Sequence, residues 1–102
     1  MVDVCFADPG AAAAEVHEQC EGGDEWYVGT AADPRYRLSV LHNVDLEAGR
    51  YVIVKCTNVG VALGTARLLR QEHGYQGALG SGGVDSVYVY AYAITPETRQ
   101  LE

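Results

Sequence analysis

Residues 26–42 read WYVGTAADPRYRLSVLH, and they carry the most informative pattern in the chain. The aromatic and β-branched residues at the start of this stretch predict a strand over 25–30. Asp33 and Pro34 then predict the start of a helix, because Asp caps a helix N-terminus and Pro suits its first turn. We therefore expect a strand, a short loop and a helix over 34–42.

The same residues also fit a second interpretation, in which 36–42 form a strand. Leu38 and Leu41 lie three residues apart, as on one face of a helix. Alternate residues are apolar as well, which is typical of a half-buried strand: Tyr36, Leu38 and Val40. The capping pattern is the more specific signal, and it favours the helix. If the strand forms and pairs with 50–56, the fold becomes a ferredoxin-like βαββαβ sandwich.

The remaining elements follow from periodicity and from the residues that end helices. Gly74 stands where a helix C-terminal glycine is expected, and the glycine-rich stretch 74–83 predicts a loop. Further elements are expected as strands over 2–6, 51–56 and 84–95 and helices over 11–19 and 59–73. The order β-α-β-α-β-α-β predicts a single α+β domain over 1–102, with a small, mainly antiparallel sheet of three to four strands flanked by helices.

The chain has 102 residues and a formal net charge of −7, and its charges are unevenly distributed. Segment 1–33 holds eight acidic residues and no Lys or Arg, whereas 34–70 holds six basic and two acidic residues. The overall charge disfavours general binding to nucleic acid or to an anionic membrane. The basic 34–70 segment is still suited to a local nucleic-acid site, and the acidic 1–33 segment to a basic protein partner.

The cysteine content and the hydropathy of the chain indicate in which cellular compartment the protein is expected. Cys5, Cys20 and Cys56 are odd in number and widely spaced, which is typical neither of a disulfide framework nor of a zinc site. His17 and Cys20 lie three residues apart, but two ligands do not make a metal site. The chain shows neither a signal peptide pattern near its start nor an apolar run of about 18 residues. We expect a cytoplasmic protein without a membrane partner.

Three residues in 26–42 carry the chemistry of phosphodiester recognition. Arg37 has a guanidinium that can donate two parallel hydrogen bonds to phosphate oxygens. Tyr27 in the strand and His42 at the helix end can move a proton to or from an attacking water. Each also has a purely structural interpretation: a half-buried strand tyrosine, a solvated helix arginine and a histidine that interacts with the helix dipole.

This stretch resembles the second half of the signature of the GIY-YIG nuclease family. In that family a strand ending in Tyr-(Ile or Val)-Gly precedes a helix with an Arg-Leu pair and a His a few residues later. The matching residues are Tyr27-Val28-Gly29, Arg37-Leu38 and His42. The resemblance implies metal-dependent cleavage of a phosphodiester, with Tyr27 near the water, Arg37 on the phosphate and His42 as an accessory proton or phosphate contact.

The chain departs from the family pattern in two places. It lacks a Gly-Ile-Tyr triad shortly upstream of Tyr27, and where the family has a metal-binding Glu on a later helix, the helix expected over 59–73 offers only Glu72 in its last turn. We therefore expect a degenerate, non-catalytic phosphodiester-binding domain. If the domain is active, the expected activity is that of a nuclease that uses a divalent metal such as Mg²⁺, with Glu72 as its ligand.

Each hypothesis about function makes its own structural prediction. A nuclease-like domain should gather further phosphate-binding arginines in one cleft with Tyr27: Arg35, Arg67 and Arg70. An interaction module of the inhibitor or immunity type, without enzymatic activity, should expose the acidic 1–33 segment. A ferredoxin-like small-molecule binder should dimerise through the strand over 84–95. The tyrosines of that strand also fit a platform for stacked bases or a core beneath a helix: Tyr88, Tyr90 and Tyr92.

Overall fold

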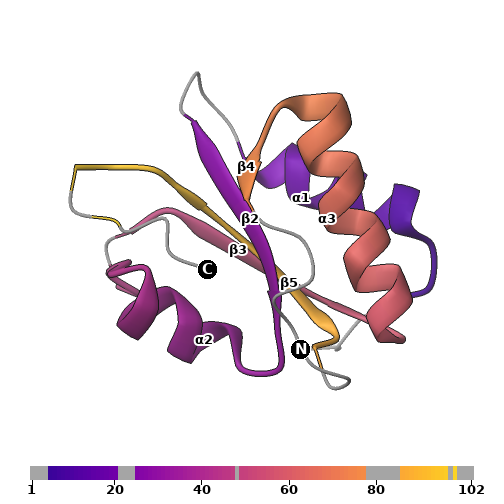
Figure 1. Cartoon of the computed structure of the whole chain (residues 1–102), viewed down its shortest axis with the longest axis horizontal. Coiled ribbons are helices and arrows are strands. Elements are labelled where there is room, and N and C mark those ends of the chain that lie inside the picture. Colours follow the sequence, from indigo (N-terminus) through magenta and orange to yellow (C-terminus); the bar gives the residue numbers. More distant parts are fainter. Residues whose placement is uncertain (1–4, 21–24, 48, 78–85, 97, 99–102) are drawn as a thin grey trace.

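The computed structural model describes residues 5–20, 25–47, 49–77, 86–96 and 98. They form a five-stranded sheet with the strand order β1-β3-β5-β2-β4 (Figure 1). The helices α1 and α3 lie on one side of this sheet, and α2 with the π-helix η1 lies on the other. No helix within these ranges is long and apolar enough to cross a membrane. The elements are β1 (Cys5–Phe6), α1 (Pro9–Gln19), β2 (Trp26–Ala31), α2 (Pro34–Tyr36), η1 (Arg37–Leu41), β3 (Tyr51–Cys56), α3 (Val59–His73), β4 (Gln76–Gly77) and β5 (Tyr88–Ala93).

The α+β class is confirmed, but the sheet is mixed and larger than the expected three to four, mainly antiparallel strands. β5 pairs antiparallel with both β2 and β3, whereas the two-residue edge strands β1 and β4 pair parallel with β3 and β2. The sequence does not reveal β4, because this strand consists of two residues at the start of the glycine-rich stretch. Residues 78–83 of the loop predicted there lie outside the described residues.

Side chains and a glycine set the helix ends, largely where the sequence predicts them. The Asp8 carboxylate accepts a hydrogen bond from the Ala11 amide, and the Asn58 side chain accepts one from the Val61 amide. Gly74 ends α3 with φ at 72°, a left-handed conformation that costs glycine little. These contacts matter because the first and last turns of a helix leave backbone groups without intrahelical partners.

The stretch 34–41 is helical, so the ferredoxin-like alternative, which required a strand there, is wrong. The Asp33 carboxylate accepts a hydrogen bond from the Tyr36 amide at 3.2 Å. After one α-helical turn the chain widens into η1, where the His42 amide donates to the Arg37 carbonyl at 3.0 Å. This bond spans five residues instead of four, and such π turns are rare and frequent at functional sites.

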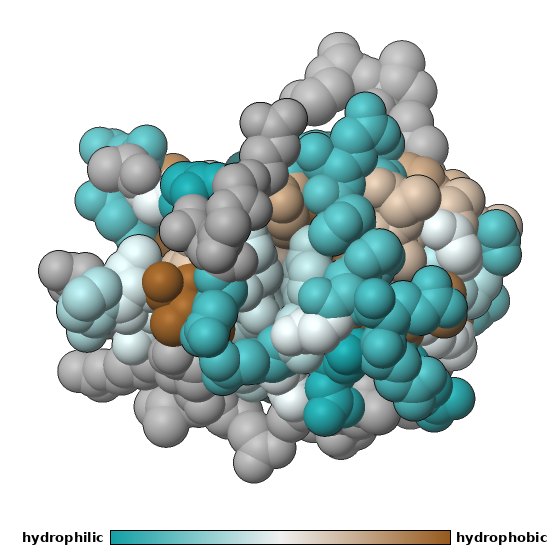
Figure 2. Space-filling view, turned by 90° about the horizontal axis from the view of Figure 1, so that it is seen from above, coloured by the Kyte–Doolittle hydropathy of each residue, from teal (hydrophilic) through white to brown (hydrophobic). Residues whose placement is uncertain are grey.

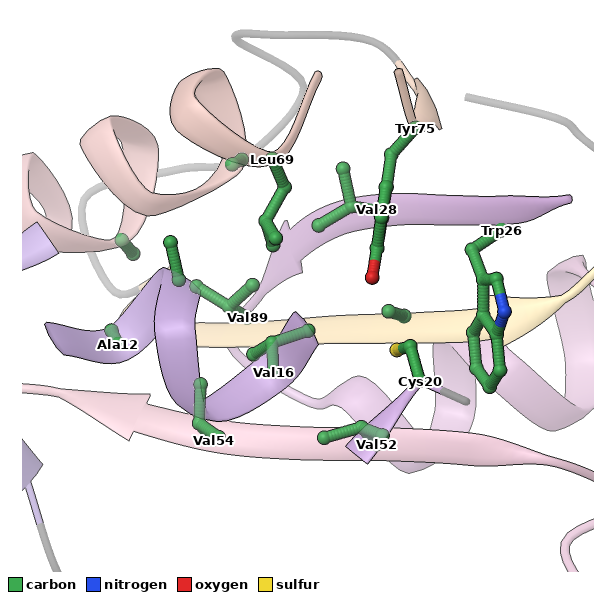
Figure 3. Close-up of a cluster of buried hydrophobic side chains, with 14 of the residues drawn as sticks. Ala12, Val16, Cys20, Trp26, Val28, Val52, Val54, Leu69, Tyr75 and Val89 are labelled. Atoms are coloured by element: carbon green, nitrogen blue, oxygen red, sulfur yellow. The ribbon is translucent and has the colours of Figure 1, made fainter. Parts of the chain in front are cut away.

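Alternation along the strands builds a different core on each face of the sheet. We call the face covered by α1 and α3 the apolar face, because Val, Ala and Trp side chains of the strands meet apolar helix residues there (Figure 3). We call the face covered by α2 and η1 the aromatic face, since tyrosines of the strands dominate it. In β5 the two sets alternate: Val89 and Ala91 lie on the apolar face, and Tyr90 and Tyr92 lie on the aromatic face.

β5 lies in the middle of the sheet, between β3 and β2. Both of its edges are therefore hydrogen-bonded within the chain. A dimer usually extends a sheet through a strand whose edge is free. A dimer in which two copies of this tyrosine strand pair edge to edge is not compatible with this topology.

Candidate functional site

The aromatic face contains a cluster of buried polar rings centred on His42. His42 follows η1 directly and is fully buried. Its Nε2 lies 2.8 Å from the Tyr90 hydroxyl, and its Nδ1 lies 3.1 Å from the Tyr92 hydroxyl. Each nitrogen of the ring therefore has a protein partner away from water. We call the following four residues the ring cluster: Tyr27, His42, Tyr90 and Tyr92.

The π turn explains why the side chains of Arg37 and His42 both reach the ring cluster. Five residues along an α-helix leave two side chains about 140° apart around the axis. In η1 the turn closes over five residues, so the two residues come close to lying one above the other. Arg37 is half-buried, and its side chain hydrogen-bonds the Tyr90 hydroxyl. A regular α-helix through the same sequence would direct Arg37 and His42 to different surroundings.

Gly29 provides the space that Tyr90 needs. The two residues are directly opposite each other in the β2–β5 pair. A Cβ atom on Gly29 would lie 2.5 Å from the Tyr90 hydroxyl oxygen and 2.7 Å from its Cζ, well inside van der Waals contact. Because Gly29 has no side chain, the Tyr90 ring lies over β2 and its hydroxyl reaches His42. The Tyr27-Val28-Gly29 triplet thus supplies one ring of the cluster and the space for another.

The donors and acceptors around His42 depend on its tautomer, since a neutral imidazole has one N–H group and one bare nitrogen. Arg37 can only donate, so the Tyr90 oxygen accepts from it. In the tautomer with the imidazole proton on Nδ1, the Tyr90 hydroxyl donates to His42 Nε2. The Nδ1 proton is then donated to the Tyr92 oxygen. The hydrogen bonds form one series, from Arg37 through Tyr90 and His42 to Tyr92.

Burial controls the ionisation of the two β5 tyrosines. Burial, with a smaller effect of Tyr27, raises the pKa of Tyr90 to about 12, although Arg37 opposes this rise through its charge and its hydrogen bond. Burial is also the main cause of the raised pKa of Tyr92, followed by Tyr27 and Tyr90. Both hydroxyls are therefore neutral at physiological pH and do not act there as bases.

Tyr27 completes the cluster through ring contacts. It is buried in β2, and its ring centroid lies 5.0 Å from that of His42 and 5.3 Å from that of Tyr92. These distances are typical of favourable aromatic pairs. The three residues singled out by the sequence, Tyr27, Arg37 and His42, therefore come together at one place on the aromatic face.

Four further residues are predicted for the site, and the structure does not bring all of them to the ring cluster: Arg35, Arg67, Arg70 and Glu72. Arg35 is exposed on α2, close in sequence to Arg37. Arg67, Arg70 and Glu72 belong to α3, which packs on the apolar face. The sheet separates these three residues from the ring cluster, so the expected cleft with all the arginines does not form. The physical reason is that sequence patterns show which residues of a helix are apolar but not which face of a sheet they cover.

Tyr90 and Tyr92 belong to the candidate site although no sequence pattern places them there. Their alternation with Val and Ala predicts a strand with one aromatic face. That pattern does not show that the aromatic face meets His42, which lies 48 residues before Tyr90. The glycine opposite Tyr90 becomes informative only once the register of β2 and β5 is known.

The divalent metal implied by the family resemblance does not fit this site. Glu72, its expected ligand, is exposed on the opposite side of the sheet. Within the described part of the chain, no three His, Cys, Asp or Glu side chains come together in a way that could hold a metal ion. The ring cluster offers neutral hydroxyls and an imidazole whose two nitrogens are both hydrogen-bonded.

A second group of polar side chains lies on the apolar face, where α1 and α3 end. His17 Nδ1 lies 3.1 Å from the Tyr75 hydroxyl, and the His17 ring stacks on that of His73 with centroids 3.8 Å apart. Tyr75 also hydrogen-bonds the thiol of Cys20, whose pKa is raised mainly by burial (Figure 3). His17 in α1 and Cys20, the residue that follows this helix, are thus linked through the Tyr75 hydroxyl.

Comparison with known proteins provides no relative from which a function could be transferred. No family model, no curated protein and no solved structure matches this chain. The geometry of the aromatic face therefore has to carry the functional argument.

Proposed function

We propose that this chain binds a phosphodiester group at Arg37, beside the ring cluster, and does not cleave it. The observation that supports this best is the hydrogen-bonded series from Arg37 through Tyr90 and His42 to Tyr92. In terms of the family resemblance, the chain would be a degenerate nuclease core that keeps a phosphate-binding arginine. Its ligand would be a nucleic acid, in contact with the part of the basic 34–70 segment that α2 and η1 carry, Arg35 and Arg37.

The series supports binding because it holds the guanidinium in place before a ligand arrives. A free arginine side chain loses about 2 kcal/mol of rotamer entropy when it is immobilised. Arg37 is half-buried and bonded to a tyrosine that is itself bonded to a buried histidine, so part of this cost is already met in the folded chain. A guanidinium has five N–H donors and can hold Tyr90 while it presents a donor pair to a phosphate.

Binding without cleavage is supported by the burial, hydrogen bonding and ionisation of the groups that would have to move protons. A general base must accept a proton from a water within hydrogen-bond reach. His42 is fully buried and both of its nitrogens are hydrogen-bonded to tyrosines, and burial keeps those tyrosines neutral. A metal-bound hydroxide is no substitute, because the described residues do not fit a metal ion.

Fluorescence anisotropy with a labelled oligonucleotide at low salt tests the proposed binding. Arg37→Gln should weaken binding about tenfold, since it removes a charge-assisted bidentate contact. The matched control is Arg67→Gln, which changes the net charge equally but on an exposed position of α3, across the sheet. Equal weakening by the two substitutions, or no binding by the wild-type chain, would contradict the proposal.

The absence of cleavage is tested separately with the same labelled oligonucleotide. Incubation with the wild-type chain and Mg²⁺ or Mn²⁺ should leave the strand intact on a denaturing gel. Cleavage that disappears in both Arg37→Gln and His42→Ala, but not in Arg67→Gln, would show that the ring cluster is an active centre.

A second candidate function is binding of a basic protein through the acidic 1–33 segment. Its specific support is exposure, since the described acidic residues of this segment are all exposed or half-buried: Asp8, Glu15, Glu18, Glu25 and Asp33. The other three lie outside the described residues: Asp3, Glu21 and Asp24. Exposed acidic groups speed association with a basic partner and make the complex sensitive to salt.

Binding to poly-L-lysine tests this second function. The double substitution of Glu15 and Glu18 by Gln should weaken binding severalfold at low salt, because it removes two negative charges from α1. Glu72→Gln is the control, because it removes one exposed negative charge on α3, outside that segment. If Glu72→Gln weakens binding as much per charge as the α1 substitutions do, the acidic 1–33 segment has no special role.

A further inference from the structure

Tyr36 differs from the other tyrosines of the chain in its exposure to water. All seven tyrosines are described, and six of them are buried or half-buried. Tyr36 is 53% exposed at the end of α2. Among the coloured residues of the face seen in Figure 2, apolar areas lie between hydrophilic ones. An aromatic ring that the fold leaves in water, in a chain that buries its other tyrosines, indicates a ligand contact.

The surroundings of Tyr36 are basic and held in place. Tyr36 lies between Arg35, which is exposed, and Arg37, which bonds Tyr90 of the ring cluster. The Tyr36 amide donates to the Asp33 carboxylate at 3.2 Å, and the Ser39 hydroxyl donates to the Arg35 carbonyl at 2.8 Å. The backbone that presents the ring and the two guanidinium groups is therefore fixed by side-chain hydrogen bonds at both ends.

A second apolar side chain extends this surface by one helical turn. Val40 is 54% exposed in η1, four residues after Tyr36. Two such residues are far too few for a stable protein interface, which buries about 800 Å² on each partner. They match the size of one planar base instead, because an aromatic ring offers a stacking surface and a neighbouring methyl-bearing side chain extends it.

The combination of one exposed ring and two flanking arginines distinguishes between forms of nucleic acid. In a duplex the bases are stacked on one another, and a protein surface without a groove-reading helix meets mainly phosphates. In a single strand each base has a face that can stack on an aromatic side chain, while the adjacent phosphates pair with arginines. Arg35, which is exposed next to Tyr36, is suited to a phosphate beside a base stacked on Tyr36, and Arg37 to the phosphodiester beside the ring cluster.

We propose that Tyr36 is a base-stacking position and that the chain prefers single-stranded over double-stranded nucleic acid. This inference rests on the proposed phosphodiester binding at Arg37 and adds the form of the ligand to it. Arg37 holds one phosphate, the Tyr36 ring stacks on the neighbouring base, and Arg35 lies next to the following phosphate.

The experiment compares a labelled single strand of about 12 nucleotides with the duplex formed by the same strand and its complement. Tyr36→Ala should weaken binding of the single strand about tenfold and leave binding of the duplex within about twofold, because only the single strand loses a stacking contact. Tyr36→Phe keeps the ring and should bind the single strand as the wild type does. Tyr36 is exposed, and circular dichroism should show that both variants are folded.

The outcomes separate this inference from the proposed function. If Arg37→Gln weakens binding of both ligands but Tyr36→Ala changes neither, phosphodiester binding stands and the stacking position is refuted. If Tyr36→Ala weakens both ligands equally, or Tyr36→Phe weakens the single strand as much as Tyr36→Ala does, the preference for single strands does not come from stacking. If Arg37→Gln changes neither ligand, the proposed function is refuted and the inference with it.

Discussion

Both faces of the sheet hold a cluster of buried side chains, but the two clusters are stabilised in different ways. On the apolar face, Val, Ala, Leu and Trp side chains from the strands, α1 and α3 form a cluster with few hydrogen-bonding groups (Figure 3). On the aromatic face, buried tyrosines surround a fully buried histidine and bond to it. Both faces are served by the same strand, since β5 directs alternate residues to each.

The two faces differ in how strictly they constrain the identity of their residues. Apolar packing depends on volume and is not directional, so the apolar face can accept conservative substitutions with some repacking. The aromatic face depends on directed hydrogen bonds, a π turn and a glycine at a defined position. A protein that only needed a second core could use apolar residues there. The directed arrangement is the reason why we propose a binding site on the aromatic face.

The largest expected effect is the loss of a large side chain from the apolar face. Leu69→Ala should lower the free energy of unfolding by about 4 kcal/mol, because Leu69 is fully buried and its truncation leaves a cavity. Urea denaturation followed by circular dichroism measures the change. Val40→Ala, at an exposed position of η1, should change the same free energy by less than about 0.5 kcal/mol. A loss below about 1.5 kcal/mol in Leu69→Ala would mean that this face repacks far more easily than its burial indicates.

The next largest expected effect is a loss of folding stability at high pH, which arises from Tyr90 on the aromatic face. The pKa of Tyr90 is about 12 in the folded chain and about 10 for an unfolded tyrosine. The unfolded chain therefore ionises first as the pH rises. The stabilisation by neutral Tyr90 is complete below about pH 10, and about 2 kcal/mol of it is lost by pH 12.

Urea denaturation between about pH 9 and pH 12 measures this loss, and Tyr90→Phe should make the decrease in stability with pH shallower. Tyr75, whose hydroxyl is bonded to Cys20 on the apolar face, has its pKa raised mainly by burial as well. Tyr75→Phe is therefore the matched comparison, and it should leave the contribution of Tyr90 intact. An equally steep decrease in Tyr90→Phe and in the wild type would contradict the raised pKa of Tyr90.

The third and smallest effect tests whether the aromatic face depends on Gly29. Gly29→Ala should lower the free energy of unfolding by about 2 kcal/mol, since the added methyl group overlaps the Tyr90 hydroxyl and ring. In a Tyr90→Ala background the same substitution should cost almost nothing, because the overlap is gone. A double-mutant cycle by urea denaturation measures the coupling. Additive effects of the two substitutions would show that Gly29 does not serve to accommodate Tyr90.

Much of the secondary structure could be predicted because its signals are local. Asp8 and Asp33 cap the helices that they precede, and Gly74 ends α3, as expected from residues within a few positions of each helix end. The π turn over 37–41 could not be predicted, because its sequence also fits an ordinary α-helix. The short strands β1 and β4 depend on partners elsewhere in the chain, and two residues give no periodicity to detect.

The candidate site could be predicted in part, for the same physical reason. Tyr27, Arg37 and His42 lie within one strand–loop–helix unit, so their proximity follows from local structure. Tyr90 and Tyr92 come to the site from β5, through pairing with β2 across more than half of the chain. The placement of Arg67, Arg70 and Glu72 depends on the face that α3 covers, and no local pattern encodes that face.

The amino-acid sequence by itself determined where the longer helices and strands lie and which residues of each element share a side. It did so because caps, turns and periodicity act over a few residues. Only the tertiary structure decided that β5 lies between β2 and β3, that α3 covers the apolar face, and that His42 is buried between two tyrosines. These features result from pairing and burial over the whole chain, in which both faces of the sheet must be covered at once.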